Sequence, residues 1–265
     1  MKKYVVIGNP IEHSLSPKLH NFWIKSNNIK AVYEKEKILK NELKNVIDRL
    51  RNNKLNGINV TVPYKAEIIN YIDELTDESK YTQSVNTIFQ RNDKIVGHNT
   101  DIAGFDLSLR HSKLNLKNKK VLILGAGGVC PSLIYALKKH ETQEVAISNR
   151  TYSKAEDVKK KFNEIKIIKW ESFYDFDLVI NATSLGLKPN DKIKIDHKIL
   201  KPNKIFYDVV YNPGETNFLR EAKINNHKTQ HGMMMFIYQA HQAFTIWHNI
   251  MPKIDNKITE LLKNE

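Results

Sequence analysis

An apolar segment that runs into a cluster of glycines most constrains how this chain can fold. Residues 120–125 form a nearly continuous apolar run, which is typical of a strand buried on both faces of a parallel sheet. The glycine turn, residues 125–129, follows that run and precedes a helical pattern. Apolar segments of the same kind recur at Glu144–Ser148, Asp177–Ala182 and Lys204–Val210. The second half of the chain is therefore predicted to be an α/β structure with a parallel sheet.

A segment in the first half gathers polar groups at the end of a predicted strand. Gly57–Val62 alternates apolar and polar side chains, so Asn59 and Thr61 would project from the same face. Pro63 cannot donate to a ladder and should end the strand, and Lys65 lies just beyond it. The segment would aim an amide, a hydroxyl and an ammonium at a small oxygen-rich ligand, with the lysine available for proton transfer. The alternative is an edge strand with a hydrated face.

Capping residues and spacing predict helices elsewhere in the chain. Ser16 is the expected cap of one helix, and Thr76 or Asp77 is the expected cap of another. The boundary between the two halves is predicted inside the helical stretch Ile102–Leu114, with no flexible glycine or serine linker. Met233–Ile250 carries apolar and aromatic residues at helical spacing, and we expect this helix to pack back across both halves.

Composition narrows the classes of partner. The chain has 42 basic and 29 acidic residues, a net charge of +13, but only six basic residues are arginine and the lysines are spread along its length. Because arginine is the preferred reader of phosphates and bases, we expect no nucleic-acid partner, whereas anionic metabolites and phosphorylated cofactors would be attracted. The ten histidines show no metal-ligand spacing, so no metal site is predicted.

The cellular compartment is predicted from apolar segments and cysteine usage. No apolar run reaches the ~18 residues that a membrane helix needs, and no secretory signal precedes the first strand. Cys130 is the single cysteine, which excludes an internal disulfide. These features predict a cytoplasmic protein without a membrane partner.

The glycine turn predicts a dinucleotide site. Glycines let the backbone approach a pyrophosphate, and the following helix N-terminus supplies N–H donors. A strict G-x-G-x-x-G would need glycine where Cys130 stands, so a tight turn without a ligand is the alternative. After the next strand, where an NAD site offers an acid, the chain has Arg150, with Lys154 one turn later. The guanidinium fork suits the 2′-phosphate of NADP, so NADP is predicted over NAD; an exposed arginine without a ligand is the alternative.

Taken together, many short motifs make the chain resemble the shikimate dehydrogenase family over nearly its whole length. The motifs are, in chain order, Gly8–Pro17, Asn59–Lys65, Val85–Thr87, Gly97–Asp101, the glycine turn, Asn149–Thr151, Asn181–Gly186, Tyr207–Tyr211, Gly232-Met233 and Gln239. The chain departs from the family pattern at Ile102, where glycine is common, and at Pro131 after the glycine turn. None of these departures removes a polar group that the chemistry would use.

The resemblance implies an α/β fold with an N-terminal α/β substrate domain and a Rossmann-like NADP-binding domain, with a cleft between them. The substrate domain would comprise residues 1–101, joined by C-terminal helices in 233–265, and the NADP domain residues 102–232. The implied reaction is the reversible NADPH-dependent reduction of 3-dehydroshikimate to shikimate, in aromatic amino-acid and chorismate biosynthesis. Lys65 would donate and recover the proton, and Asp101 would pair with Lys65 and share the same hydroxyl.

The resemblance also implies residues for each ligand. The substrate residues would be Ser14, Ser16, Asn59, Thr61, Lys65, Asn86, Asp101, Tyr211 and Gln239. The cofactor residues would be Asp77, Gly125, Ala126, Gly127, Gly128, Val129, Asn149, Arg150, Thr151, Lys154, Val209 and Gly232. For Asp77, a capping carboxylate is an equally good explanation.

Other functions of the same fold stay open at this point. A shikimate/quinate dehydrogenase of broader specificity differs in the recognition of one ring hydroxyl. A non-catalytic sensor of shikimate and NADP would not need Lys65 and Asp101, both of which the chain retains. A homodimer is left open beside a monomer.

Overall fold

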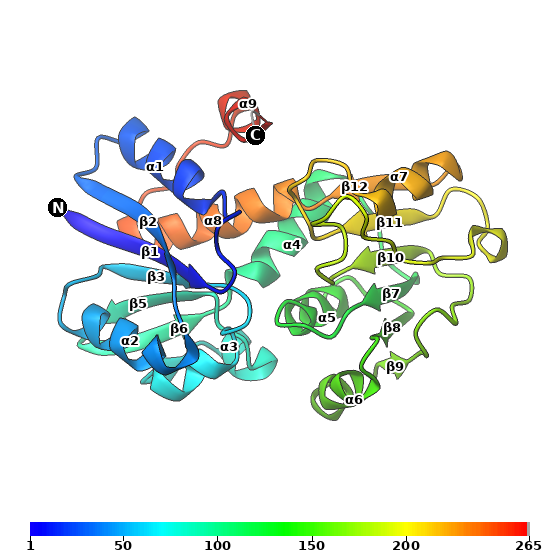
Figure 1. The fold of residues 1–265 in the computed structure, drawn as a ribbon, viewed down its shortest axis with the longest axis horizontal. Helices are drawn as coiled ribbons and strands as arrows, with labels where there is room; N and C mark the ends of the chain where they lie inside the picture. Colours follow the sequence, from blue (N-terminus) through cyan, green and yellow to red (C-terminus); the bar gives the residue numbers. More distant parts are fainter. Residues whose placement is uncertain (264–265) are drawn as a thin grey trace. The chain divides into compact units, whose positions relative to one another are not determined.

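The protein consists of two compact units, each built around a six-stranded sheet (Figure 1). A computed structural model describes residues 1–263. Unit 1 comprises Met1–Gly104 and Ile237–Glu265, and unit 2 comprises Phe105–Phe236. Helix α4 (Thr100–His111) and helix α8 (Met233–His248) each contribute residues to both units. The sheets and their covering helices confirm the predicted α/β fold class.

The sheet of unit 1 is mixed, with strand order β2-β1-β3-β5-β6-β4. Its strands are β1 (Lys2–Gly8), β2 (Ala31–Lys37), β3 (Gly57–Val60), β4 (Glu74–Leu75), β5 (Thr87–Arg91) and β6 (Lys94–His98). Strands β2 and β3 run parallel to β1, whereas β5 runs antiparallel to both β3 and β6. Its remaining helical segments are α1 (Ser16–Ser26), η1 (Lys40–Glu42), α2 (Leu43–Arg51), η2 (Glu67–Tyr71), α3 (Asp77–Thr82) and α9 (Asn256–Lys263).

The alternation of side chains along β1 gives the sheet of unit 1 two covered faces. Val5 and Ile7 pack into a core cluster with helix α2, whose buried residues lie three or four positions apart: Leu43, Val46, Ile47 and Leu50. On the opposite face the ring of Tyr4 lies 5.1 Å from that of Trp247 on α8. The same helix brings Phe244 against Trp23 of α1, with ring centroids 5.6 Å apart. The C-terminal segment of the chain therefore completes the core of the N-terminal unit.

Two local predictions in unit 1 need correction. Strand β3 ends at Val60 rather than Val62, and the Val62 side chain is 57% exposed. Thr61 and Val62 lie beyond the strand, although the Thr61 N–H still donates to the Ile7 carbonyl at 2.9 Å and the Val62 carbonyl accepts from the Asn9 N–H at 3.0 Å. Ser16 is the first residue of α1 rather than its cap; Leu15 is the cap residue, and the Ser16 N–H is accepted by the Ser14 hydroxyl.

The sheet of unit 2 is parallel throughout, with strand order β12-β11-β10-β7-β8-β9. Its strands are β7 (Lys120–Leu124), β8 (Glu144–Ser148), β9 (Lys166–Ile167), β10 (Leu178–Asn181), β11 (Ile205–Asp208) and β12 (Lys228–His231). The helical segments between them are α5 (Cys130–Lys138), α6 (Tyr152–Lys161), η3 (His197–Ile199) and α7 (Asn217–Ile224). The chain leaves β7 toward β8 and later returns to β10 on its other side, so the order reverses between β7 and β10. This is the doubly wound arrangement that binds dinucleotides outside the reversal point.

The four long apolar segments of the second half are confirmed as strands of this sheet. The strand predicted at Glu144–Ser148 has the predicted bounds, and the other three are one to three residues shorter than predicted. Right-handed crossovers place α5 and α6 on one face and α7 on the other (Figure 1). Phe218, Leu219 and Ala222 of α7 pack into a cluster with apolar residues of β7, β10 and β11.

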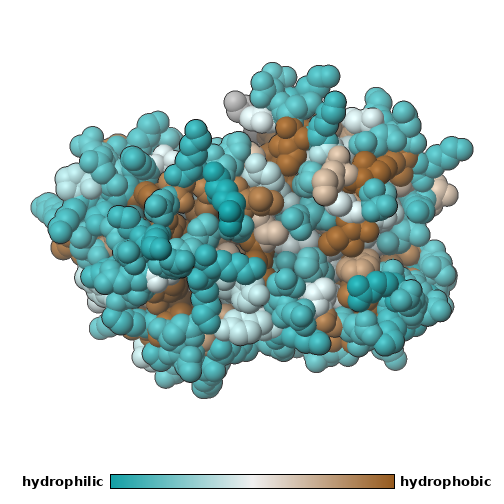
Figure 2. All heavy atoms as spheres, turned by 180° about the vertical axis from the view of Figure 1, so that it is seen from behind, coloured by the Kyte–Doolittle hydropathy of each residue, from teal (hydrophilic) through white to brown (hydrophobic). Residues whose placement is uncertain are grey.

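The surface seen in Figure 2 is mainly hydrophilic, with small groups of hydrophobic atoms exposed among the hydrophilic ones. Such a surface is ordinary for a folded chain with many lysines. Among residues 1–263, no helix combines the length and apolar content needed to cross a bilayer.

Candidate active site

A buried ion pair forms the centre of the candidate site in unit 1. Lys65 Nζ donates to Asp101 Oδ2 at 2.6 Å, and the two side chains are only 10% and 8% exposed. Lys65 follows the end of β3, and Asp101 lies in the first turn of α4. Removing one partner of such a pair leaves a buried charge uncompensated, which costs about 3–5 kcal/mol. The fold therefore holds an ammonium and a carboxylate in contact at the edge of the sheet.

Asn86 fixes the second oxygen of that carboxylate. Its Nδ2 donates to Asp101 Oδ1 at 2.9 Å, and its Oδ1 accepts from the Thr100 backbone N–H at 2.8 Å. The hydroxyls of Thr87 and Thr100 also donate to Asn86 Oδ1, each at 3.1 Å. Neither threonine was predicted to have a role, although both lie inside the motifs Val85–Thr87 and Gly97–Asp101. The two threonine hydroxyls therefore position the Asn86 amide, and that amide positions the Asp101 carboxylate.

Asn59 joins the same network from β3. Its Nδ2 donates to the Asn86 backbone carbonyl at 2.9 Å and to Thr87 Oγ1 at 3.0 Å. Four of the predicted substrate residues are thus linked by direct or shared hydrogen bonds in one buried cluster: Asn59, Lys65, Asn86 and Asp101. An ammonium, a carboxylate and two amides at one place can bind and protonate an oxygen-rich small molecule.

The other predicted substrate residues lie on separate elements of the two units. Ser14 and Ser16 lie at the start of α1, where the Ser14 hydroxyl accepts the Ser16 N–H at 3.3 Å. Thr61 is half-buried just past β3, and Gln239 is half-buried on the part of α8 that belongs to unit 1. Tyr211 belongs to unit 2, where its ring stacks on Phe236 with centroids 4.4 Å apart.

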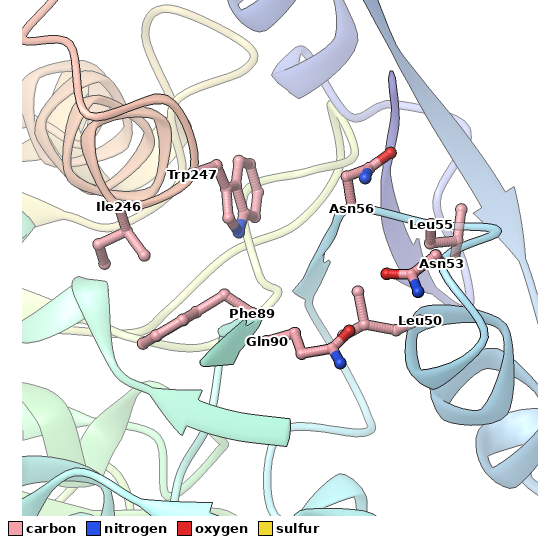
Figure 3. A pocket seen from close by; sticks show the side chains of 8 residues that line it. All are labelled: Leu50, Asn53, Leu55, Asn56, Phe89, Gln90, Ile246 and Trp247. Atoms are coloured by element: carbon pink, nitrogen blue, oxygen red, sulfur yellow. The ribbon is translucent and has the colours of Figure 1, made fainter. Parts of the chain in front are cut away.

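A small hollow elsewhere in unit 1 is separate from this cluster. It measures about 190 Å³ and is lined by Leu50, Asn53, Leu55, Asn56, Phe89, Gln90, Ile246 and Trp247 (Figure 3). Asn56 precedes β3, whereas Lys65 follows its other end. The hollow therefore lies at the opposite end of the strand from the ion pair. Among the described residues 1–263, no three His, Cys, Asp or Glu side chains gather closely enough to hold a metal ion.

The glycine turn in unit 2 combines a forced backbone conformation with open space. Gly125 has φ +111°, and a Cβ there would meet the Ala182 carbonyl carbon at 2.9 Å, so the end of β7 requires glycine. A Cβ on Gly127 would meet nothing within 4 Å, and both Gly127 and Gly128 are exposed. Val129 is the N-cap of α5. The exposed backbone at this helix N-terminus is the donor set that a pyrophosphate needs.

The residues after β8 extend this surface. Asn149 Oδ1 accepts the Ala126 N–H at 3.1 Å, and Asn149 Nδ2 donates to the Thr151 carbonyl at 2.8 Å, so the two loops are tied together. Arg150 and Lys154 are exposed, and within residues 1–263 the Arg150 guanidinium has no hydrogen bond or ion pair. An unpaired guanidinium beside a predicted dinucleotide turn fits a phosphate group.

The remaining cofactor candidates divide between the units. Gly232 follows β12, and a Cβ there would lie 2.3 Å from the Val209 carbonyl oxygen, so the two backbones meet directly. Asp77 belongs to unit 1, where it is an exposed residue in the first turn of α3 after the N-cap Thr76. Asp77 is thus the one cofactor candidate that unit 2 does not contain.

Asp208 is a buried carboxylate at the end of β11 to which the sequence analysis gave no role. Its Oδ1 accepts from the Val210 N–H at 2.9 Å and from Asn181 Nδ2 at 3.0 Å, and its Oδ2 accepts from the Thr216 hydroxyl at 2.6 Å. Burial raises the pKa of Asp208 to about 6, although these three donors act to lower it. The residue ties the ends of β10 and β11 together.

Known proteins resemble this chain over its whole length. The families described as "Shikimate dehydrogenase substrate binding domain" and "Shikimate / quinate 5-dehydrogenase" match residues 6–88 and 107–193. A shikimate dehydrogenase (NADP(+)) from Pelagibacter ubique is 54% identical over 261 residues, which cover 98% of each protein.

Solved structures resemble the fold equally well. The shikimate dehydrogenase from Aquifex aeolicus matches with a TM-score of 0.91 and 35% identity, over 100% of this chain and 98% of that one. The Thermus thermophilus enzyme, solved in complex with NADP(H) and shikimate, matches with a TM-score of 0.89 and 30% identity over 98% of both chains.

The pKa of Asp208 generates a prediction about pH and stability. Because the folded carboxyl titrates near pH 6 and the unfolded one near 3.8, the folded state keeps a proton that the unfolded state has already released. This residue's contribution to the free energy of unfolding should therefore fall as pH rises from about 4 to about 6, by roughly 3 kcal/mol in total. Asp208→Asn, which mimics the protonated group, should remove that fall.

Urea unfolding at several pH values between 4 and 7 measures the difference between the two proteins. Asp191→Asn is the control, because backbone N–H donors lower the pKa of Asp191, whereas burial raises that of Asp208. A constant difference between wild type and Asp208→Asn across the range would contradict the prediction.

Proposed function

Because the chain belongs to the shikimate dehydrogenase family, we propose that it catalyses the reversible NADPH-dependent reduction of 3-dehydroshikimate to shikimate. This reaction is a step of chorismate and aromatic amino-acid biosynthesis. The observation that carries the proposal is the buried contact between Lys65 and Asp101, 2.6 Å from Nζ to Oδ2. A buried ammonium can protonate a carbonyl oxygen and stabilise the negative charge that develops on it, and the carboxylate fixes the position of the ammonium. The single cysteine, Cys130, is buried and free, which fits a reducing compartment such as the cytoplasm.

Unit 2 is suited to hold NADP. Gly125, Gly127 and the N-terminus of α5 would receive the pyrophosphate, and Arg150 with Lys154 would receive the 2′-phosphate. Val209 and Gly232 would contribute backbone surface rather than side chains. When bound, the reduced nicotinamide supplies the hydride.

Lys65 supplies the proton in this proposal. Its Nζ would donate to the substrate carbonyl oxygen as negative charge develops there, and would take the proton back in the oxidative direction. Asp101 orients Nζ through one carboxylate oxygen while Asn86 holds the other. The pair is buried, so water competes weakly for the reacting oxygen and the charge of the ammonium acts at close range.

The remaining polar residues would bind the substrate at its two ends. Ser14 and Ser16, at the N-terminus of the eleven-residue helix α1, suit a carboxylate because backbone N–H groups and the helix dipole favour an anion there. Tyr211 would approach the same end of the substrate. Thr61 and Gln239 would complete the contacts to ring hydroxyls, together with Asn59, Lys65, Asn86 and Asp101.

A dehydrogenase that also accepts quinate is the second candidate. It is favoured by the family match of residues 107–193, whose description names both shikimate and quinate. Both candidates use the same ion pair and the same cofactor site. They differ in how well the site accepts one more ring hydroxyl, which can change specificity by several powers of ten.

Initial rates of NADP reduction test the proposal directly. With the purified protein, we expect rapid formation of reduced nicotinamide from shikimate and a much slower rate from quinate, measured by absorbance. Comparable rates with both acids would establish the second candidate. No rate with either, from folded protein that binds NADP, would contradict both.

Lys65→Ala should lower kcat by about 100-fold or more, with little change in KM, because the proton transfer matters mainly in the transition state. Lys204→Ala is a matched control, since Lys204 is also buried and pairs with Asp175 and Asp177, but in unit 2. Steady-state kinetics on both folded variants makes the measurement. Near-normal kcat in Lys65→Ala would show that Asp101 or a water molecule, and not Lys65, donates the proton.

Arg150→Ala should weaken NADP by about tenfold or more and leave NAD nearly unchanged, because a charge-assisted bond to the 2′-phosphate exists only with NADP. Dissociation constants for both nucleotides, measured by calorimetry, check this. Arg91→Ala removes another exposed arginine, which pairs with Glu74 in unit 1, and should change neither constant. Equal losses of NADP and NAD in Arg150→Ala would contradict the assignment.

A further inference from the structure

Tyr33 is a buried tyrosine that contacts Asn59 of the candidate substrate site. It lies on β2, its side chain is 1% exposed, and its hydroxyl is 2.6 Å from Asn59 Oδ1. No motif of the sequence analysis included it. The hydrogen bond joins a fully buried tyrosine to one of the four residues of the buried cluster.

The surrounding groups decide which way the Asn59 amide faces. Asn59 Nδ2 is 2.9 Å from the Asn86 backbone carbonyl, which can only accept, so this atom must be the nitrogen. Its second proton goes to Thr87 Oγ1. The atom facing Tyr33 is therefore the oxygen, and the Tyr33 hydroxyl must donate. Both amide protons are used, and the part of Asn59 left for a ligand is a lone pair on Oδ1.

Asn86 has the opposite polarity for the same kind of reason. The Thr100 backbone N–H can only donate, so the atom that it contacts at 2.8 Å must be Asn86 Oδ1. Asn86 Nδ2 then faces Asp101 and uses one of its two protons there. Two neighbouring amides thus offer a ligand different groups: Asn59 an acceptor and Asn86 a donor.

The Tyr33 ring is itself held in place by α1. Its backbone N–H donates to Asn21 Oδ1 at 2.9 Å, and its carbonyl accepts from Asn21 Nδ2 at 2.8 Å. Its ring stacks on His20 with centroids 4.1 Å apart and planes 5° from parallel. Burial lowers the pKa of His20 to about 3, so the imidazole is neutral at physiological pH and the stack carries no charge. The hydroxyl has little freedom to leave Asn59.

We propose that Tyr33 is a positioning residue: the Asn86 carbonyl and Thr87 hydroxyl fix Asn59 Nδ2, and the Tyr33 hydroxyl donates to Oδ1 and holds that oxygen in place. Asn59 then faces the ligand only as an acceptor, so the substrate hydroxyl that meets it must donate its proton. The inference rests on the proposed function for the identity of the substrate, but not for the polarity of the amide. Ligands that present only an acceptor at this position, such as an ether or a carbonyl oxygen, are rejected because two lone pairs would face each other.

Tyr33→Phe tests the proposal with a set of related substrates. The rates are measured with shikimate and with analogues in which a ring hydroxyl that is not oxidised is replaced by hydrogen. We expect KM for shikimate to rise about tenfold, with kcat changed less than about threefold, because the lost contact positions the substrate in the ground state and the transition state alike. One analogue lacks the hydroxyl that meets Asn59. For that analogue only, Tyr33→Phe should raise KM much less than it does for shikimate.

Tyr64→Phe is the matched control. Tyr64 is also buried in unit 1, and its hydroxyl donates to the Ile38 carbonyl at 2.8 Å, so the variant loses an equivalent hydrogen bond without touching Asn59. It should affect shikimate and all analogues by one common factor. If Tyr33→Phe also changed KM by one common factor for every substrate, the role of Tyr33 would be structural and the proposal would be wrong.

A measurement without turnover separates this inference from the proposed function. In the unliganded wild type, the Asn59 side-chain N–H signals, assigned by comparison with Asn59→Asp, should shift in Tyr33→Phe and stay in place in Tyr64→Phe. Unshifted signals in Tyr33→Phe would overturn the proposal. A wild type that oxidises neither shikimate nor quinate, but shows the expected shift, would overturn the proposed function and leave the role of Tyr33 supported.

Discussion

The burial of Asp101 is the constraint on which the polar core of unit 1 depends. A carboxylate removed from water needs hydrogen-bond donors. Here Lys65 donates to Oδ2 of Asp101 and Asn86 donates to Oδ1. Lys65 follows β3, Asn86 precedes β5, and Asp101 lies in the first turn of α4. The ends of two strands and the start of a helix must therefore keep their relative positions for the charge to remain satisfied. The proposed proton transfer would therefore use a geometry that folding itself must maintain.

In unit 2 the corresponding constraint is backbone packing at the ends of the strands. Gly125 has no space for a side chain against Ala182, and Gly232 has none against Val209. These close approaches leave peptide groups rather than side chains at the edge of the sheet, which is what a phosphate-bearing cofactor requires. Asp208 holds two of the strand ends together behind that edge. Unit 1 therefore presents a buried ion pair, whereas unit 2 presents neutral peptide groups.

The sequence predicted the fold well where hydrophobic pattern alone decides it. Glu144–Ser148 has its predicted bounds, because a parallel strand buried on both faces has a continuous apolar signal. The end of β3 was misplaced because Val62 continues the alternation although the ladder has already ended. Lys65 and Asp101 were predicted to pair, and the structure has them in contact. The threonines behind Asn86 and the role of Asp208 were missed, since a side chain that acts through a neighbour has no signal of its own in the sequence.

Tyr33 shows most clearly why such residues escape a sequence reading. An asparagine side chain carries both a donor and an acceptor. A motif containing Asn59 therefore predicts a polar contact, but not whether Asn59 donates or accepts in it. The choice is made by the Asn86 carbonyl, the Thr87 hydroxyl and the Tyr33 hydroxyl, which come from distant parts of the chain. Two chains with the same contacting residues but a different residue at position 33 would present the same motif, but the Asn59 oxygen would be held less firmly. In the proposed site, specificity would therefore depend on the whole hydrogen-bond network and not only on the residues that contact the ligand.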